Sequence, residues 1–332
     1  MNLKLPASEP IHIINPLWDV SGGSEWEAIQ LFNVLSRERK TTLWTEYTPD
    51  PLLAERYPIS TVEPWKLKFP KTGTFIIVGV YFRVSKWVWW ARPRRIIIVV
   101  NTDGHADWVR KKRFLSRFRW IPIETVHVGC MTPQSRDDDL TRRDISPIDI
   151  ERFNVGNPDR HLSGTRFTVG RLSRDVPLKH HPDDPRFYRR LASQGATIRI
   201  MGGCVLSADL ADMPGMELLA AGSEDAVSFL HGIDCFYYRT APEWLETFGR
   251  VVLEAMACGL PVVCENRGGY REYIRHGVNG FLFENDDEAL EIILRLKADP
   301  ALRKHIGEAA RKTVEQIYST SHLTGLIEYY TR

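Results

Sequence analysis

Glu246 to Pro261 reads ETFGRVVLEAMACGLP, a short glycine loop followed by an apolar run with helical spacing. Gly249 stands where the helix is expected to begin, so backbone N–H groups without helical partners point outward with the positive end of the helix dipole. That arrangement suits a phosphate. Glu246 precedes the helix and Glu254 lies about two turns into it, so that carboxylates at both ends could accept hydrogen bonds from sugar hydroxyls. The same pattern also fits a buried amphipathic helix with a glycine at its entrance.

On both sides of this stretch, short β-rich segments alternate with helical ones, in both halves of the chain. The expected strands are residues 11–15, 75–81, 95–101, 166–169, 197–201, 235–238 and 261–264, and the expected helices are residues 24–36, 85–90, 187–194, 226–231 and 250–258. Nearly all-apolar strands that alternate with helices indicate parallel sheets covered on both faces. The sequence therefore predicts an α/β protein with two doubly wound, Rossmann-like domains.

The length of 332 residues fits two domains. A breaker-rich segment, Val-Gly-Asn-Pro-Asp within residues 154–164, precedes the first strand of the second half. We expect an acceptor-binding domain over residues 1–155 and a donor-binding domain over residues 156–315. A last helix, residues 316–332, is expected to pack back on the first domain. Ligands of such sheets bind outside the carboxyl ends of the strands, so two facing sheets would enclose a cleft for two substrates.

The composition excludes several classes of protein. Apolar content of 43% and charged content of 26% are ordinary for a folded chain. The longest apolar runs are too short to span a bilayer, and no secretory signal core is visible at the N-terminus. Five scattered cysteines form no close metal-ligand pair and argue against a disulfide framework. We expect a cytoplasmic protein, with the inner face of the cell membrane as its alternative location.

Basic and aromatic residues gather in the first half. Between Lys66 and Trp120 there are 14 basic residues and two acidic ones, together with five of the chain's ten tryptophans and Trp65 just before them. The segment WVRKKRFLSRFRW is interpreted as a patch for an anionic membrane surface or an acceptor, whereas a docked amphipathic helix is the plain alternative. No nucleic-acid module is recognisable, so no nucleic-acid partner is expected. The patch residues are Trp108, Arg110, Lys111, Lys112, Arg113, Arg117 and Arg119.

Two cations follow the first strand of the second half, Arg171 at its expected end and Lys179 eight residues later. Fixed cations beside a helix mouth stabilise the charge that grows on a departing diphosphate, although solvated surface cations are as common. In the first half, Gly23 lies in a glycine pair that lets backbone approach a ligand closely. His105 follows a buried strand and could polarise an acceptor, with Asp103 as its rival for the role of base.

Two other motifs give weaker evidence of a functional site. Asp137, Asp138 and Asp139 lie among arginines and are interpreted as a solvated loop, and the pair His180-His181 shows no third metal ligand. We expect no metal site and no cofactor other than the co-substrate.

Taken together in their order, these motifs resemble the retaining family-four glycosyltransferases of the GT-B fold, which use nucleotide-diphosphate sugars. The resemblance covers nearly the whole chain. Its segments are GGSE, SPIDIERF, VGRLSRDVPLK, IRIMGG, HGIDCFYYRT, ETFGRVVLEAMACGLPVV and RGGYREYIRHGVNGFLF.

The resemblance implies roles for individual residues. Arg171 and Lys179 would hold the diphosphate, Glu246 the sugar hydroxyls and Glu254 the ribose. The remaining implied contacts are backbone amides around Phe248, Gly249 and Arg250 with sugar and phosphate, Gly23 with phosphate, and His105 near the reacting sugar. Thr247 and Arg250 depart from the family pattern, which usually has glycine and an aliphatic residue there, and so bear on the identity of the sugar. Lys179 is also further from Arg171 than the family spacing, which suggests a short loop insertion.

The implied reaction is transfer of the sugar with retention of configuration and without a divalent metal, to a glycan or lipid-linked acceptor of cell-surface polysaccharide. A sugar-nucleotide epimerase or hydrolase of the same fold is the alternative, since it would share the donor site but need no acceptor. A non-catalytic sugar-nucleotide-binding subunit is less consistent with four retained charged groups. A nicotinamide dehydrogenase is disfavoured because the three-glycine turn and its acidic partner are missing.

Overall fold

The computed structural model describes residues 9–101, 105–116, 121–129, 141–156 and 166–332. The chain forms two compact units: unit 1 comprises Met1–Pro147 and Thr320–Arg332, and unit 2 comprises Ile148–Ser319. This division differs from the expected boundary at residue 155, because Asp149 and Phe153 form a turn whose contacts belong to unit 2.

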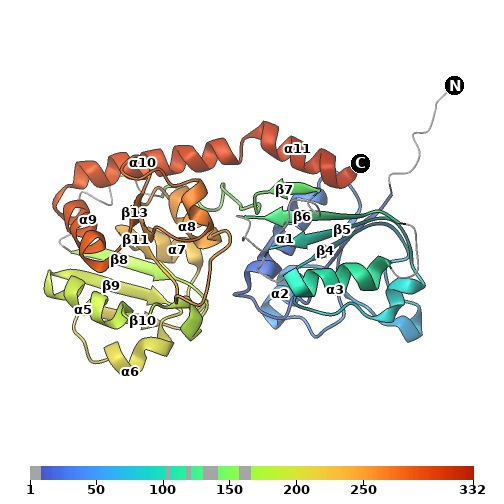
Figure 1. Cartoon of the computed structure of the whole chain (residues 1–332), viewed down its shortest axis with the longest axis horizontal. Coiled ribbons are helices and arrows are strands. Elements are labelled where there is room, and N and C mark those ends of the chain that lie inside the picture. Colours follow the sequence, from blue (N-terminus) through green and yellow to red (C-terminus); the bar gives the residue numbers. More distant parts are fainter. Residues whose placement is uncertain (1–8, 102–104, 117–120, 130–140, 157–165) are drawn as a thin grey trace. The chain divides into compact units, whose positions relative to one another are not determined.

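Unit 1 holds a seven-stranded parallel sheet in the order β3-β2-β1-β4-β5-β6-β7. Figure 1 shows its strands with helices around them. The strands are β1 (Ile11–Ile14), β2 (Thr41–Thr45), β3 (Ile59–Thr61), β4 (Thr72–Val78), β5 (Arg92–Val100), β6 (Ile123–Val128) and β7 (Arg142–Asp144). The helices are α1 (Gly23–Leu35), α2 (Pro51–Arg56), α3 (His105–Ser116) and α11 (Thr320–Thr331), with short 3-10 turns η1 (Pro64–Lys66) and η2 (Lys86–Trp89).

Helix α11 belongs to unit 1 although it follows all of unit 2 in the sequence, and Figure 1 shows it beside β7. Arg142 of β7 donates to the Gly325 carbonyl at 3.3 Å, and Arg95 of β5 donates to the Tyr329 carbonyl at 2.5 Å. The Tyr329 hydroxyl in turn donates to Glu124 of β6 at 2.8 Å. Three neighbouring strands thus hold this helix by polar contacts.

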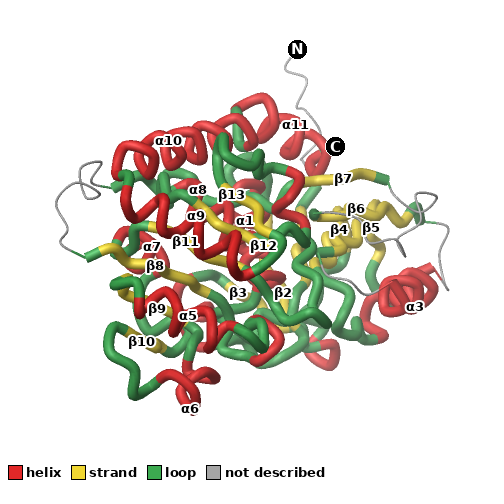
Figure 2. The backbone as a smooth tube through the Cα atoms, turned by 60° about the vertical axis from the view of Figure 1, so that its left-hand side comes forward, coloured by secondary structure: helices red, strands yellow, loops and turns green. Residues whose placement is uncertain are grey.

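Unit 2 holds a six-stranded parallel sheet in the order β10-β9-β8-β11-β12-β13, drawn as yellow strands in Figure 2. The strands are β8 (Phe167–Leu172), β9 (Ala196–Met201), β10 (Met216–Leu219), β11 (Cys235–Tyr238), β12 (Val262–Glu265) and β13 (Phe281–Phe283). The helical elements are η4 (Pro177–Lys179), α5 (Asp184–Ser193), η5 (Cys204–Leu206), α6 (Ser207–Leu210), α7 (Ala226–His231), α8 (Arg250–Ala257), η6 (Gly269–Glu272), α9 (Asp286–Ala298) and α10 (Pro300–Ile317).

Strand β11 shows why the sheet of unit 2 is covered on both faces. Cys235 and Tyr237 pack in one core cluster with side chains of α5 and α9. Phe236 and Tyr238 are equally buried but alternate with them and therefore face the other side of the sheet. Helix α8 contacts β11 and β12. The prediction of two doubly wound parallel sheets is confirmed.

Each sheet has one place where the strand order reverses, between β1 and β4 in unit 1 and between β8 and β11 in unit 2. In doubly wound sheets the crevice outside the carboxyl ends of these two strands is where ligands bind. Each unit therefore has one such edge where a ligand is expected.

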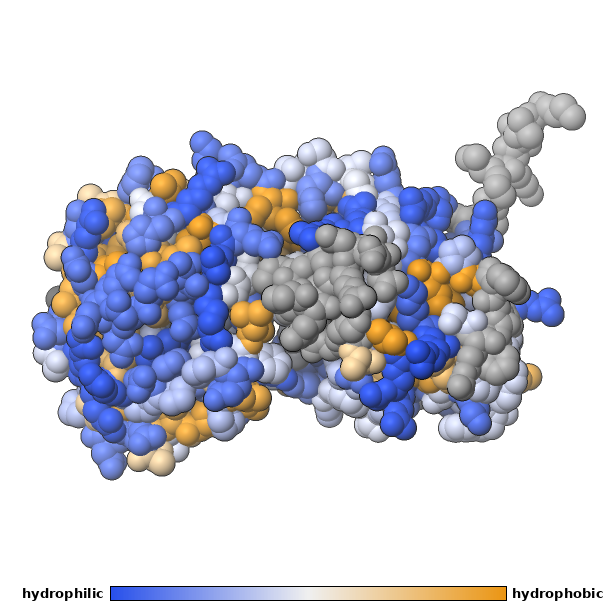
Figure 3. Space-filling view, in the orientation of Figure 1, coloured by the Kyte–Doolittle hydropathy of each residue, from blue (hydrophilic) through white to orange (hydrophobic). Residues whose placement is uncertain are grey.

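The surface is mixed in character. On the face drawn in Figure 3, apolar residues form small patches among hydrophilic ones. Within the described ranges, no helix has the length and apolar composition needed to cross a bilayer.

Candidate functional site

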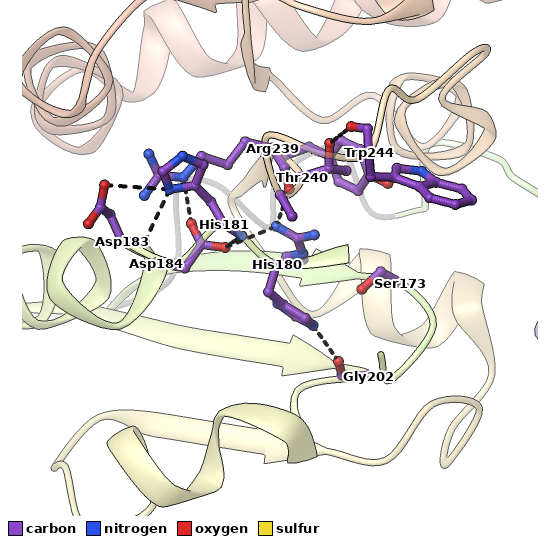
Figure 4. Close-up of polar contacts among 12 residues, drawn as sticks. Ser173, His180, His181, Asp183, Asp184, Gly202, Arg239, Thr240 and Trp244 are labelled. Carbon is purple, nitrogen blue, oxygen red and sulfur yellow. Dashed lines mark hydrogen bonds and ion pairs between the residues drawn. The ribbon is translucent and has the colours of Figure 1, made fainter. Parts of the chain in front are cut away.

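A buried ionic network lies at the carboxyl edge of β8 and β11. Arg171 of β8 donates from Nη1 to the Arg239 carbonyl at 2.6 Å, and the same atom lies 3.4 Å from the Asp184 carboxylate. Asp184 begins α5 and also accepts from Arg239 Nε at 2.6 Å, as Figure 4 shows. Arg239 donates further to Asp286 of α9 at 2.6 Å. One edge of the sheet thus carries two arginines held by two aspartates.

Arg171 departs from its expected placement as a cation open to a ligand, because its side chain is only 1% exposed. Its position in the strand is the expected one, since β8 runs to Leu172 and Arg171 is its last residue but one. Its guanidinium lies 4.9 Å from the centre of the Tyr238 ring, on the neighbouring strand. In the part of the chain that the structure describes, its Nε and Nη2 donors have no hydrogen-bond partner.

Lys179 and Glu246 form the second polar pair at this edge, joined at 2.5 Å between Nζ and Oε2. The Tyr238 hydroxyl donates to the same carboxylate oxygen at 2.8 Å. Burial alone would raise the pKa of Glu246, but the Lys179 ammonium and the hydrogen bonds from Lys179 and Tyr238 outweigh burial and lower it. Glu246 is therefore an ionised acceptor whose neighbours fix its position. Tyr238 connects this pair to the Arg171 network.

The loop that carries Glu246 rests on another backbone segment. Gly269 donates its N–H to the Glu246 carbonyl at 2.7 Å, and any side chain at Gly269 would clash with the Thr247 carbonyl. The Tyr273 hydroxyl lies 3.0 Å from the carbonyls of both Phe248 and Gly249. The segment with the two glycines at 268 and 269 therefore supports the Glu246 loop, although it is distant from the loop in the sequence, and the close backbone contacts require glycine at both positions.

Helix α8 begins directly after this loop. Its N-cap residue Gly249 has φ 75°, a left-handed conformation that glycine adopts without strain, and a Cβ there would also press on Tyr270. Phe248 is buried and Thr247 is half-buried. The helix mouth expected from the sequence is thus present, with its glycine at the first turn.

Glu254 lies on α8 and is paired with Arg250 one turn earlier, at 3.0 Å between Oε1 and Nε. Burial raises the pKa of Glu254, and the Arg250 guanidinium only partly offsets the increase. A hydroxyl that donated to Glu254 would therefore have to share it with Arg250.

Several residues of the site were not singled out from the sequence. Trp244 lies in the loop before Glu246, with Lys179 Nζ 5.0 Å and the Arg174 guanidinium 5.9 Å from its ring centre. Arg267 holds the same loop by donating to the carbonyls of Ala241 and Pro242, both at 2.8 Å. The only sequence signal was the presence of a tryptophan two positions before a carboxylate.

His180 lies next to Lys179, and its ring points to the Gly202 carbonyl in Figure 4. Its Nε2 lies 2.8 Å from that carbonyl oxygen, which can only accept, so Nε2 carries the proton. Burial, with the nearby Arg171 charge, lowers the pKa of His180 to about 4. The residue is therefore a neutral structural anchor for the Lys179 turn.

The matching edge of unit 1 carries amide, hydroxyl and carboxylate groups. Asn15, just after β1, donates to the Val78 carbonyl of β4 at 2.9 Å and to Ser24 Oγ at 3.1 Å. Gly23 begins α1, is exposed and has open space where a side chain would be. The Tyr81 hydroxyl donates to Glu25 at 3.2 Å. A ligand would meet open backbone here, as expected for Gly23.

Aromatic side chains surround this edge. Trp18 follows β1, Tyr47 follows β2 and Tyr81 follows β4. The ring of Trp18 lies 5.0 Å from that of Tyr47 and 5.9 Å from that of Tyr81. Trp18 is 45% and Tyr81 39% exposed. We call Trp18, Tyr47 and Tyr81 the aromatic edge of unit 1.

The structure says less about His105. It is the first residue of α3, but its side chain lies outside the described part, as does Asp103. Nothing is therefore added to its expected role.

The patch expected over Trp108 to Arg119 is wrong for two of its members. Trp108 is 3% exposed and donates from Nε1 to Thr125 of β6 at 3.2 Å, so it belongs to the core. Lys111 is 6% exposed, with its Nζ 3.5 Å from the centre of the Phe82 ring, and burial lowers its pKa to about 7. The helical period places both residues on the side of α3 that faces the sheet.

The other patch residues behave differently. Arg110 and Arg113 are exposed, and Lys112 Nζ lies 4.8 Å from the Trp108 ring centre. Arg117 and Arg119 lie outside the described residues, as do Asp137, Asp138 and Asp139. Among the described residues, no group of three or more histidine, cysteine or carboxylate side chains could hold a metal ion.

Comparison with known proteins gives the class of this fold. The solved structure of Anabaena HepE in complex with UDP-glucose matches 97% of this chain and 98% of its own, with a TM-score of 0.70 at 18% identity. The two doubly wound units are thus those of a GT-B glycosyltransferase fold.

The sequence is similar to that of known glycosyltransferases. Residues 218–313 match the family described as "Glycosyl transferases group 1". The D-inositol 3-phosphate glycosyltransferase of Thermobifida fusca is 33% identical over 254 residues, 70% of this chain. The capsular polysaccharide biosynthesis glycosyltransferase CapM of Staphylococcus aureus is 27% identical over 190 residues, 52% of this chain. These matches span only about half of the two relatives, 54% and 49%. The chain thus has the GT-B fold and is similar in sequence to the group 1 glycosyltransferases, which confirms the resemblance to that group.

Proposed function

We propose that this chain transfers a sugar from a nucleotide-diphosphate sugar, bound at the carboxyl edge of β8 and β11, to a glycan or lipid-linked acceptor. The observation that carries the proposal is the Lys179–Glu246 pair at the mouth of α8, with Tyr238 on the same carboxylate oxygen. The Lys179 cation and the ionised Glu246 carboxylate lie side by side, and they match the diphosphate and the sugar of a nucleotide-diphosphate sugar. The diphosphate binds Lys179, and the sugar hydroxyls donate to Glu246.

Each remaining site residue has a place in this proposal. Arg171, buried with its guanidinium 4.9 Å from the centre of the Tyr238 ring, adds a second positive charge that holds the diphosphate. The backbone of Phe248 and Gly249 approaches the sugar, Thr247 and Arg250 select it, and Glu254 accepts from the ribose. In unit 1, Gly23 contributes backbone to phosphate, His105 lies near the reacting sugar, and the aromatic edge binds the acceptor.

The reaction follows from the charges. As the bond between the anomeric carbon and the diphosphate breaks, negative charge grows on the leaving oxygen, and fixed cations stabilise that transition state. The leaving diphosphate takes the proton of the attacking acceptor hydroxyl on the same face, so configuration is retained. Lys179 and Arg171 supply the countercharge that a divalent metal would otherwise provide. We place the reaction in the synthesis of cell-surface polysaccharide or glycolipid, in the cytoplasm or at the membrane's inner face, because CapM serves capsular polysaccharide.

A thermal-shift screen against nucleotide-diphosphate sugars, beginning with UDP-glucose, tests the donor site. A bound donor raises the apparent unfolding temperature by mass action. The screen is run with EDTA present, where the proposed metal independence predicts the same shift. If no donor shifts the unfolding temperature, the proposal is rejected. Consumption of the donor at the same rate with and without acceptor would instead indicate the epimerase or hydrolase alternative.

A further inference from the structure

The most exposed large apolar side chains of the described structure lie close together in the sequence of unit 1. Trp65 is 78%, Leu67 66% and Trp90 65% exposed. None of them lies at the carboxyl edge of β1 and β4 that the proposed function uses. Large exposed apolar side chains that gather on one surface mark an interaction site.

Leu67 shows that this exposure is built into the fold. The backbone N–H and C=O groups of Glu63 and Lys68 pair with each other at 2.8 and 3.1 Å and close a tight turn over residues 64–67. Leu67 lies in this turn at φ 55° and ψ 26°, the left-handed region that costs free energy for a residue with a side chain. The turn therefore holds Trp65 and Leu67 in a defined shape on the surface.

Trp90 is connected to this turn by the buried side chain of Phe69. Phe69, just after the turn, is buried, with its ring 6.4 Å from the ring of Trp90. The Arg92 N–H donates to the Lys71 carbonyl at 2.6 Å where β4 and β5 begin. The two exposed segments are thus anchored to the same part of the sheet.

Exposed cations alternate with these apolar side chains: Lys66, Lys68, Lys71 and Arg92. Glu63 pairs with Lys66 at 2.5 Å and with Lys68 at 3.7 Å. Within the described residues no ion pair joins Lys71 or Arg92 to a carboxylate. The surface formed by Trp65, Leu67, Trp90 and these four cations, which we call the tryptophan surface, is therefore net positive.

We infer that the tryptophan surface docks unit 1 on an anionic lipid bilayer. Tryptophan settles at the headgroup boundary, leucine enters the acyl region, and lysine and arginine are attracted to anionic headgroups. A nucleic acid would use the cations and stack on the tryptophans, but Leu67 offers no stacking face. The surface replaces the patch expected on α3, where Trp108 and Lys111 are buried. The inference concerns binding to lipid and stands whether or not the proposed transfer occurs.

Sedimentation of the full chain with vesicles tests the inference. Binding is expected to vesicles of phosphatidylcholine with about one third phosphatidylglycerol, to be weaker with phosphatidylcholine alone, and to fall with added salt. Replacing Trp65, Leu67 and Trp90 together by serine should lower the partition coefficient at least about tenfold. Replacing Lys71 and Arg92 by serine should lower the partition coefficient as much, but for anionic vesicles only.

Brominated acyl chains should quench the parent's tryptophan fluorescence more than that of the Trp65→Ser variant.

Matched controls separate docking from a general loss of structure. Leu52→Ser removes a half-exposed apolar side chain on α2, and Lys304→Ser with Lys312→Ser removes two exposed cations on α10. Both should bind vesicles like the parent. Leu67→Gly relieves the left-handed backbone, so it should unfold at the same or a higher temperature and yet bind more weakly. Parent protein that stays in the supernatant with both vesicles, a triple variant that binds like the parent, or retention by heparin but not by vesicles would each overturn the inference.

Discussion

The two sheet edges where the strand order reverses have the same topology but opposite chemistry. At β8 and β11, unit 2 gathers Arg171, Arg239 and Lys179 with carboxylates. At β1 and β4, unit 1 offers amide, hydroxyl and aromatic groups and the Glu25 carboxylate around an open glycine. The fold supplies a ligand crevice in both places, and side chains decide what it can hold. A charged donor suits the first edge and a hydroxyl-bearing acceptor suits the second.

The largest effect is expected from removing the carboxylate of the charged edge. Glu246→Ala should lower sugar transfer on the order of 10³-fold, since it deletes an acceptor for the sugar hydroxyls and leaves Lys179 unpaired. Its loss should be at least as large as that of Arg171→Ala. Steady-state transfer assays measure both. The control is Glu243→Ala, an exposed carboxylate three positions away in the same loop. Near-parental turnover in Glu246→Ala or Arg171→Ala would refute the donor assignment.

The second test concerns stability, because the charged edge is also a buried one. Asp184 has a fully buried side chain and holds both Arg171 and Arg239. Asp184→Ala should lower the free energy of unfolding of unit 2 by about 3 kcal/mol or more, since the buried Arg171 loses its carboxylate partner and Arg239 keeps only Asp286. Urea denaturation followed by circular dichroism measures the loss. Asp287→Ala breaks an exposed pair with Arg190 and should leave the midpoint unchanged. Equal effects of the two substitutions would contradict the buried network.

The third substitution tests whether the two edges bind different substrates, and its expected effect is the smallest. Trp18→Ala removes an exposed ring of the aromatic edge and should weaken acceptor binding about tenfold, seen as a higher acceptor KM. The thermal shift with UDP-glucose should not change, because no donor group is touched. A reduced donor shift with unchanged acceptor KM would reverse the roles of the two edges.

Much of the fold could be predicted from the sequence because its signals are local. The predicted bounds of β11 and α7 match the structure, because the residues at which an apolar run or a helical period begins and ends can be identified from the sequence alone. Gly249 also lies at the predicted helix mouth, as only glycine adopts its backbone conformation without strain.

The rest could not be predicted because it depends on partners that are distant in the sequence. Nothing near Arg171 indicates that Asp184 and the Arg239 carbonyl enclose it. Nor does the basic sequence of α3 show that Lys111 lies against Phe82, a residue of another loop. A charged residue signals polarity, but its burial is decided by what packs around it.

The placement of α11 affects how the chain folds during synthesis. Unit 2 is one continuous segment and can complete its core as soon as Ser319 has left the ribosome. Unit 1 must wait, since Arg95, Glu124 and Arg142 find their partners on α11 only after all of unit 2 has been made. The usual order, in which the N-terminal domain matures first, is reversed.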